Sequence, residues 1–390
     1  MDTYSLGNAG RFYFDWAATA VPEIPYPEDA VPFGNPSSHH YEGRKAREAL
    51  ENARSRCAAV LGVPAKDIYF TSGGTESNAL VLHAMLLRKS NACILASSVE
   101  HPSVRENCLV LEQMGKQIAS VGVEKDGRVT VSTLEKALEK HPKTRFAAIM
   151  AVNNEIGSKM DIPELVGLIR NRSGGGGMPV HIHSDLVQAA GKIPLDIAAW
   201  DLDSASISAH KLGGPRGIGL LYLRKSLNPM YTGGGQERRI RPGTENTPGA
   251  VALAGCLERR GNPATVQPEY QKASDRFKEL IRFLGSLQGC SLIPEDRREE
   301  DERFSPYIVQ ARFKGIPGEV MVRALDDAGF AVSTGSACSA SSQDRPVLAA
   351  MGLDKQAGLE GIRISQGWST TKEEIAGLTN AIQDILARFG

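Results

Sequence analysis

Short apolar segments alternate with amphipathic, helix-like segments from about residue 45 to residue 225, and this alternation constrains the fold more than any other feature of the sequence. Apolar strands separated by helices are typical of a mostly parallel β-sheet that is covered by helices on both faces. We therefore predict an α/β fold whose large domain holds a mostly parallel seven-stranded sheet between helices. The predicted strands are 68–71, 92–97, 117–123, 146–152, 180–184, 204–208 and 218–223, and the predicted helices include 43–61, 75–89, 101–114 and 132–140.

The chain changes character after residue 256. The polar segment ERRGNPATVQPEY (258–270) contains two prolines and is expected to be a connector, and the charge run EDRREEDER (295–303) is expected to be a solvated loop. A chain of 390 residues is too long for one typical core, so two domains are expected. We predict a large domain over 14–256 and a smaller α/β domain made of 1–13 and 257–390.

Composition excludes several classes of function. The 45 basic and 45 acidic residues balance, which argues against a broad surface for nucleic acid or an anionic membrane. No apolar run reaches the length of a membrane span, and the first residues lack the pattern of a signal peptide. The six cysteines form no CxxC pair, which fits a reducing compartment and argues against a zinc site. We expect a cytoplasmic protein without a metal, nucleic-acid or membrane partner.

Chemically versatile residues follow the predicted strands, where ligands gather in open α/β sheets. In SGGTESN (72–78), Gly74 and Thr75 open a helix, and such a turn can hold a phosphate on its backbone N–H groups. A glycine turn with a threonine cap explains the same residues. A capping or surface role is sufficient for His101, and the asparagines of NNEIG (153–157) are able to bind a ligand or to shape a turn.

Two further strand ends carry charged groups. Asp185 follows a buried strand, with Gln188 close behind, and a carboxylate there needs a cationic partner or serves as a helix cap. The strand SISAHK places Ser208, His210 and Lys211 against a glycine-rich turn. Lys211 alone is explained by a side chain that reaches solvent. A phosphate cradle, a carboxylate, a histidine and a lysine together match the phosphate, ring nitrogen, flat face and aldehyde of pyridoxal phosphate.

The sequence resembles the cysteine desulfurases of the iron–sulfur-cluster and nitrogen-fixation type, within the class-V aminotransferase group of pyridoxal-phosphate enzymes. The resemblance extends from about Tyr13 to about residue 385 and implies pyridoxal-phosphate fold type I. The motifs that carry it are YFDWAATA (13–20), GNPSSHHYEGRKAREALENAR (34–54), FTSGGTESN (70–78), EH (100–101), VNNEIG (152–157), HSDLVQAAGK (183–192), SISAHKLGGPRGIGLLY (206–222), GGGQERRIRPGTEN (233–246), STGSACSA (333–340) and IRIS (362–365).

The resemblance implies a role for each candidate. Lys211 would hold pyridoxal phosphate as a Schiff base and move the Cα proton of the substrate, while Asp185 would keep the ring nitrogen protonated. Gln188 would bond the phenolic oxygen, His101 would stack on the ring, and Asn154 would face the cofactor. The phosphate would be held by Gly74, Thr75, Ser208 and His210.

Three further residues match positions of the family that lie outside the cofactor cradle. Thr244 in RPGTEN matches a threonine that one subunit contributes to the phosphate site of the other, which implies a homodimer. Asn35 and Arg363 match residues that bind the substrate carboxylate, a task for which the planar guanidinium of arginine is well suited.

Cys338 matches the family's nucleophile. It lies among small polar residues, whereas Cys93 and Cys256 lie in apolar segments and are expected in the core. Without the resemblance, Cys338 is equally an incidental exposed thiol. With it, the Cys338 thiolate attacks the sulfur of L-cysteine and keeps it as a persulfide, leaving L-alanine. The long polar run 333–345 resembles the long, mobile cysteine loop of one class of the family.

The sulfur of the persulfide would pass to an acceptor protein, either an iron–sulfur scaffold or a thiol carrier. Three alternatives remain open at this point. A selenocysteine lyase would use the same cofactor, another class-V aminotransferase would not need Cys338, and a non-catalytic sulfur-carrier subunit would not need Lys211, Asp185 and Cys338 together.

Overall fold

The large part of the molecule is built on a seven-stranded sheet, seen here in a computed structural model that describes residues 10–25, 27, 31–88, 92–173, 179–335 and 345–389. Only the strand β8 runs antiparallel to its neighbours, so the predicted mostly parallel sheet is confirmed. In spatial order the strands are β2 (Ile68–Thr71), β8 (Gly219–Leu223), β7 (Ser204–Ser208), β6 (His181–Asp185), β5 (Thr144–Ala148), β3 (Cys93–Ser97) and β4 (Gln117–Val121).

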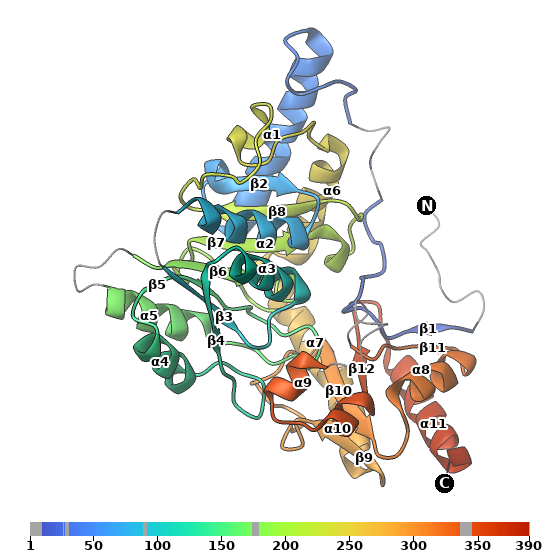
Figure 1. Cartoon of the computed structure of the whole chain (residues 1–390). Coiled ribbons are helices and arrows are strands. Elements are labelled where there is room, and N and C mark those ends of the chain that lie inside the picture. The colour runs from blue at the N-terminus through green and yellow to red at the C-terminus, as the bar shows by residue number, and fades with distance from the viewer. Residues whose placement is uncertain are drawn as a thin grey trace.

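Helices cover both faces of this sheet (Figure 1). One face packs against α2 (Gly74–His83) and α3 (Pro102–Gln113), and the other against α1 (Tyr41–Leu61), α4 (Val131–Lys140), α5 (Ile162–Ser173) and α6 (Thr247–Arg260). Strand residues alternate between the two faces, since Ile68 and Phe70 belong to one apolar cluster and Tyr69 to the other. Burial on both faces explains why these strands read as continuous apolar runs.

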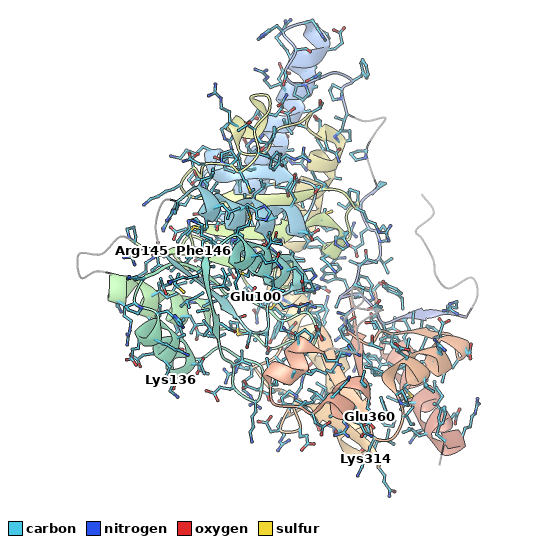
Figure 2. All side chains as sticks on the ribbon, viewed as in Figure 1. Glu100, Lys136, Arg145, Phe146, Lys314 and Glu360 are labelled. Carbon is cyan, nitrogen blue, oxygen red and sulfur yellow. The ribbon has the colours of Figure 1, made fainter. Side chains whose placement is uncertain are left out.

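A second hydrophobic core lies around a three-stranded antiparallel sheet at the lower end of Figure 1. Its strands are β9 (Cys290–Ile293), β10 (Ile308–Phe313) and β12 (Gly361–Ser365), packed by α7 (Pro263–Ser286), α8 (Gly318–Asp327) and α11 (Lys372–Phe389), with α9 (Pro346–Ala350) and α10 (Lys355–Leu359) beside them. Near the N-terminus, β1 (Phe12–Tyr13) pairs with β11 (Phe330–Ala331) and joins this part of the chain. Figure 2 shows Phe146 on the large sheet and Glu360 in the lower part. The domain limits 14–256 and 1–13 with 257–390 stay a prediction.

One local expectation is wrong, and a second holds except at one residue. The segment 258–270 is almost entirely helical, since α6 ends at Arg260 and α7 begins at Pro263. The side chain of Asn262 accepts a hydrogen bond from the N–H of Ala264, and proline suits the first helical position because it lacks an N–H that would have no partner there. The charge run 295–303 is a loop, as expected, and most of it is exposed. Arg297 is the exception, because it is buried and donates to the carbonyls of Ile156 and Ser305.

Within the described ranges, none of the helices has the length and apolarity needed to cross a bilayer. In the same residues, histidine, cysteine, aspartate and glutamate side chains form no group of three that could hold a metal ion.

Candidate active site

The candidate residues meet at one edge of the large sheet because the carboxyl ends of its parallel strands lie together there. The chain turns away from this edge after β2, β3, β5, β6 and β7, and each turn brings a candidate with it. In strand order these are Gly74 and Thr75, then His101, Asn154, Asp185 and Lys211.

A cavity of about 320 Å³ lies at this edge, at the N-terminus of α2. Gly74 begins the helix, and a Cβ at this position would lie 2.6 Å from Cγ2 of Val187. A Cβ on Gly219 of the neighbouring strand would lie 2.5 Å from Cα of Gly73. Only glycine therefore permits this close packing of the turn, which leaves backbone N–H groups and a helix N-terminus facing the cavity, an arrangement that binds anions. The lining residues are Ala18, Thr19, Ser72, Gly73, Gly74, Thr75, Ser208, His210, Arg216 and Gly217.

Two basic side chains line the same cavity. Burial, together with the nearby cations Lys211, Arg216 and Lys192, lowers the pKa of His210 to about 4, so the ring is neutral at pH 7. Its Nδ1 lies 3.1 Å from Oγ1 of Thr19. Arg216 was not singled out from the sequence, although it lies in the glycine-rich turn just after Lys211. It is exposed, and no hydrogen bond or ion pair links it to another described residue.

Asp185 is held at the end of β6 by a chain of buried polar groups. Its Oδ1 accepts the N–H of Val187 at 2.9 Å, and its Oδ2 accepts Nδ2 of Asn78 at 2.8 Å. The Oδ1 of Asn78 lies 2.8 Å from Nε2 of His183, and burial lowers the pKa of His183 to about 3. A neutral His183 that donates from Nε2 fixes the Asn78 amide with its nitrogen toward Asp185, and the Oγ of Ser204, 2.8 Å from Nδ1, completes the chain.

His101 caps α3, as the simpler interpretation of the sequence expected. Its Nδ1 accepts the N–H of Ser103 at 3.1 Å and lies 2.8 Å from the Ser103 hydroxyl. Burial lowers the pKa of His101, and the charges of Asp185 and Lys211 both act on the ring. A neutral ring whose Nδ1 is an acceptor carries its proton on Nε2. The cap thus fixes the tautomer of a histidine on which the charges of the aspartate and the lysine both act.

Lys211 and Gln188 converge on the N-terminal segment. The Nζ of Lys211 donates to the carbonyl oxygens of Ala17 at 2.6 Å and Ala18 at 2.5 Å. The Nε2 of Gln188 donates to the same Ala17 oxygen at 2.8 Å, while its Oε1 accepts Nζ of Lys192 at 2.7 Å. Because Ala18 also lines the cavity, the lysine and the anion-binding turn belong to one site.

Arg363, on β12, reaches the site from the smaller part of the chain. Its Nη1 donates to the carbonyls of Asn154 at 2.8 Å and Gly335 at 3.1 Å, and its Nη2 donates to Oδ1 of Asp15 at 2.8 Å. The buried Nε of Arg363 and the buried Oδ1 of Asn154 have no hydrogen-bond partner among the described residues. The guanidinium therefore keeps an unused donor beside the one that Asp15 occupies. No sequence signal indicated this pairing, since the two residues lie 348 positions apart.

Three candidates are not placed with the others in the described chain. Asn35 is exposed, accepts the N–H of Ser37, and is linked to the other candidates by none of the hydrogen bonds of the described residues. Thr244 is exposed and is not among the residues that line the cavity. Cys338 lies outside the described residues, as does most of the predicted loop 333–345.

The other five cysteines are poor nucleophiles, because burial raises the pKa of each thiol. The pKa reaches about 12 for Cys57, Cys108, Cys256 and Cys290, and it is also raised for Cys93. Cys93 and Cys256 lie in the core, as their apolar surroundings in the sequence predicted. A thiolate nucleophile at neutral pH is therefore not found among the described cysteines.

Curated relatives resemble the chain over nearly its whole length. A protein of Bacillus subtilis (strain 168) described as "Putative cysteine desulfurase IscS 1" is 34% identical, with 97% of this chain and 99% of the relative covered. The "Cysteine desulfurase IscS" of Rickettsia typhi (strain ATCC VR-144 / Wilmington) is 37% identical, with 95% of this chain and 90% of the relative covered.

Solved structures show the same similarity. A protein titled "NIFS-LIKE PROTEIN" superposes with a TM-score of 0.86 at 32% identity, covering 97% of this chain and 99% of that one. "SspA in complex with cysteine" superposes with a TM-score of 0.75 at 29% identity, covering 90% of this chain and 98% of that one. The sequence model of the family "Aminotransferase class-V" matches residues 12–378. The chain therefore belongs to the class-V aminotransferase family.

Proposed function

We propose that this chain is a pyridoxal-phosphate-dependent cysteine desulfurase, which removes sulfur from L-cysteine and leaves L-alanine and a persulfide on Cys338. One observation carries the proposal. The anion-binding turn, the Asp185 carboxylate and the Lys211 amine come from three strand ends to one edge of the sheet, in a chain whose curated relatives are described as cysteine desulfurases. The same descriptions favour this activity over a selenocysteine lyase, another class-V aminotransferase or a non-catalytic sulfur carrier.

The residues present fit pyridoxal phosphate. The glycine turn leaves a cavity with backbone N–H groups, the Ser208 hydroxyl, the neutral His210 and the Arg216 guanidinium around it, which is a donor set for a phosphate. Gly74, Thr75, Ser208 and His210 would hold this group, and Thr244 of a second copy would complete the site in a homodimer. When bound, the cofactor supplies an electron sink for negative charge at the substrate Cα.

The side chains divide the remaining tasks. Asp185, oriented by Asn78 and Val187, offers a carboxylate to the protonated ring nitrogen. His101 presents the flat face of a neutral ring, Gln188 an N–H donor, and Asn154 an amide. Lys211 takes the proton from the substrate Cα and returns one to carbon as alanine forms.

The substrate carboxylate binds Arg363, whose Nε is buried and unpaired among the described residues. Asn35 is proposed for the same carboxylate, which its exposed side chain is free to reach from this chain or from a second copy. With its carboxylate on Arg363, L-cysteine would offer its amino group to Lys211 and its thiol to Cys338.

The transfer of sulfur balances without an external oxidant. The thiolate of Cys338 attacks the sulfur of the substrate, an S–S bond forms and the Cβ–S bond breaks. The electron pair of that bond remains on carbon, which takes up a proton equivalent to the one that the Cys338 thiol released and so gives alanine. The proton of the substrate thiol stays with the transferred sulfur in the persulfide. A thiol of an acceptor protein, an iron–sulfur scaffold or a thiol carrier, then takes the terminal sulfur.

The test is release of alanine from L-cysteine, with a thiol reductant present, by the wild type, Cys338→Ala and Cys290→Ala. The control removes the least buried of the described cysteines. We expect alanine from the wild type and from Cys290→Ala, and none from Cys338→Ala. Equal alanine release by Cys338→Ala would show that another group accepts the sulfur, and absence of alanine from the wild type would reject the desulfurase.

A further inference from the structure

Lys192 is a buried lysine that pairs with no carboxylate among the described residues. It follows β6 by a short turn, its side chain is 2% exposed, and its Nζ has one side-chain partner among the described residues, Oε1 of Gln188 at 2.7 Å. The charged groups that act on it are both cationic, Lys211 and Arg363, and together with burial they lower the pKa of Lys192 to about 7. Burying such a group is unfavourable, and an apolar side chain of similar size would fill the same space without that penalty. Packing alone therefore does not explain a lysine here.

The bond from Lys192 fixes which way the Gln188 amide faces. With Oε1 toward Lys192, Nε2 donates to the carbonyl of Ala17 at 2.8 Å. If the amide rotated by half a turn, its oxygen would face the Ala17 oxygen and its nitrogen would face the ammonium. Both contacts would then be lost to repulsion between like groups.

With the Gln188 amide fixed in this way, the only hydrogen-bonding group that it has left to offer on the side away from Lys192 is an N–H donor. The second N–H of Gln188 has no acceptor among the described residues, and Ala17, which receives the first N–H, also receives Nζ of Lys211. The orientation of Gln188 thus decides whether a donor or an acceptor faces the group that Lys211 would hold. If the chain binds pyridoxal phosphate as proposed, the second N–H of Gln188 is the donor for the phenolic oxygen of the cofactor.

We propose that Lys192 is a positioning residue, which holds the Gln188 amide with its nitrogen toward the cofactor and the Ala17 carbonyl. The proposal rests on the proposed function, because it assigns the spare N–H to the bound pyridoxal phosphate. It differs from a purely electrostatic role, in which the charge of Lys192 would act on the cofactor directly, and from a purely structural role, in which Lys192 would only stabilise the fold.

A double-mutant cycle separates these roles. The variants are Lys192→Met, which keeps length and removes the charge and donor, Gln188→Leu, which removes the amide, and the pair together. The readout is the pH midpoint of the visible absorption band of the bound cofactor in the holoenzyme. Loss of a donor to the phenolic oxygen makes the cofactor more basic, so we expect Lys192→Met to raise the midpoint by about one pH unit, the scale of one hydrogen bond. In the Gln188→Leu background the same change should have little effect.

Two controls complete the experiment. Lys159→Met removes a partly buried lysine whose Nζ donates to the Tyr270 hydroxyl at 3.0 Å, and it should leave the midpoint unchanged. Thermal unfolding of the apoprotein should show Lys192→Met to be at least as stable as the wild type. If the methionine variant does not fold, Lys192→Leu takes its place in both backgrounds with the same expectation.

The remaining outcomes overturn the proposal. An equal shift in both backgrounds would assign a direct electrostatic effect to Lys192, and no shift in either would leave it a structural residue. A wild-type protein that shows no visible band with pyridoxal phosphate would reject the proposed function itself, whereas a normal band with no effect of Lys192→Met would reject only the positioning role.

Discussion

Replacing Glu237 by glutamine tests how strongly a buried ion pair anchors the segment that carries Thr244. The carboxylate meets Arg54 of α1 in two parallel contacts, Oε2 to Nη1 at 2.7 Å and Oε1 to Nη2 at 2.8 Å. The side chains are 1% and 3% exposed, and Oε2 also accepts the N–H of Phe70 at 2.9 Å. The pair therefore ties together α1, β2 and the turn 236–239, eight residues or fewer before Thr244.

The magnitude follows from what the variant leaves behind. Removing one partner of a buried ion pair costs about 3–5 kcal/mol, because the other charge stays buried. Arg54 keeps a contact with Glu51, whose side chain is 54% exposed, and an exposed partner returns at most about 1 kcal/mol. A glutamine at position 237 also turns its NH₂ toward either Arg54 or the N–H of Phe70, so one donor loses its acceptor. We expect a loss of about 3 kcal/mol in the free energy of unfolding.

The assay is urea denaturation at one fixed protein concentration, with Glu258→Gln as the matched control. Glu258, on α6, pairs at 2.6 Å with Arg56, which lies on α1 like Arg54. The side chains of Glu258 and Arg56 are 44% and 33% exposed. Loss of that exposed pair should cost less than about 1 kcal/mol. Equal losses for the two glutamine variants would refute the reasoning. Arg54→Met combined with Glu237→Gln should be more stable than the sum of the single losses predicts, since no unpaired charge remains.

Three further predictions concern the candidate site. Arg216→Met should weaken the binding of pyridoxal phosphate about fivefold in equilibrium dialysis, because an exposed charge-assisted contact contributes about 1 kcal/mol; an unchanged affinity would remove Arg216 from the phosphate site. Asp15→Asn should lower KM for L-cysteine several-fold in steady-state kinetics, since a charged competitor leaves Arg363, and a higher KM would show that Asp15 assists binding instead. Burial raises the pKa of Glu100, labelled in Figure 2, from 4.5 to about 7. Between these pH values the folded chain keeps a proton that the unfolded chain releases. The free energy of unfolding of the wild type therefore falls as pH rises from 4.5 to 7. Glu100→Gln should therefore gain about 3 kcal/mol on the wild type between pH 4.5 and pH 8 in denaturant unfolding, and a constant difference would contradict the raised pKa.

The large sheet was accessible from the sequence because its signals are local. A strand buried on both faces reads as an apolar run, and all seven predicted strands correspond to observed ones with shifts of a few residues. The same local reasoning failed at 258–270, because Pro263 occupies the first helical position of α7, which a helix tolerates, and α7 continues through Pro268. At 295–303 the expected solvated loop is present, but local reasoning missed the burial of Arg297, which donates to the carbonyls of Ile156 and Ser305.

For the candidate site too, some features follow from the sequence and others only from the folded structure. The sequence by itself determined which residue types end each strand, and the carboxyl ends of parallel strands must share an edge, so the grouping of Asp185, Lys211 and the glycine turn followed from topology. The tertiary structure alone decided the partners of each charge: Asp15 on Arg363, Glu237 on Arg54, and Gln188 on Lys192. The first two pairings join segments far apart in the chain, and the energy of any charged pair depends on distance and burial, which only the folded arrangement specifies.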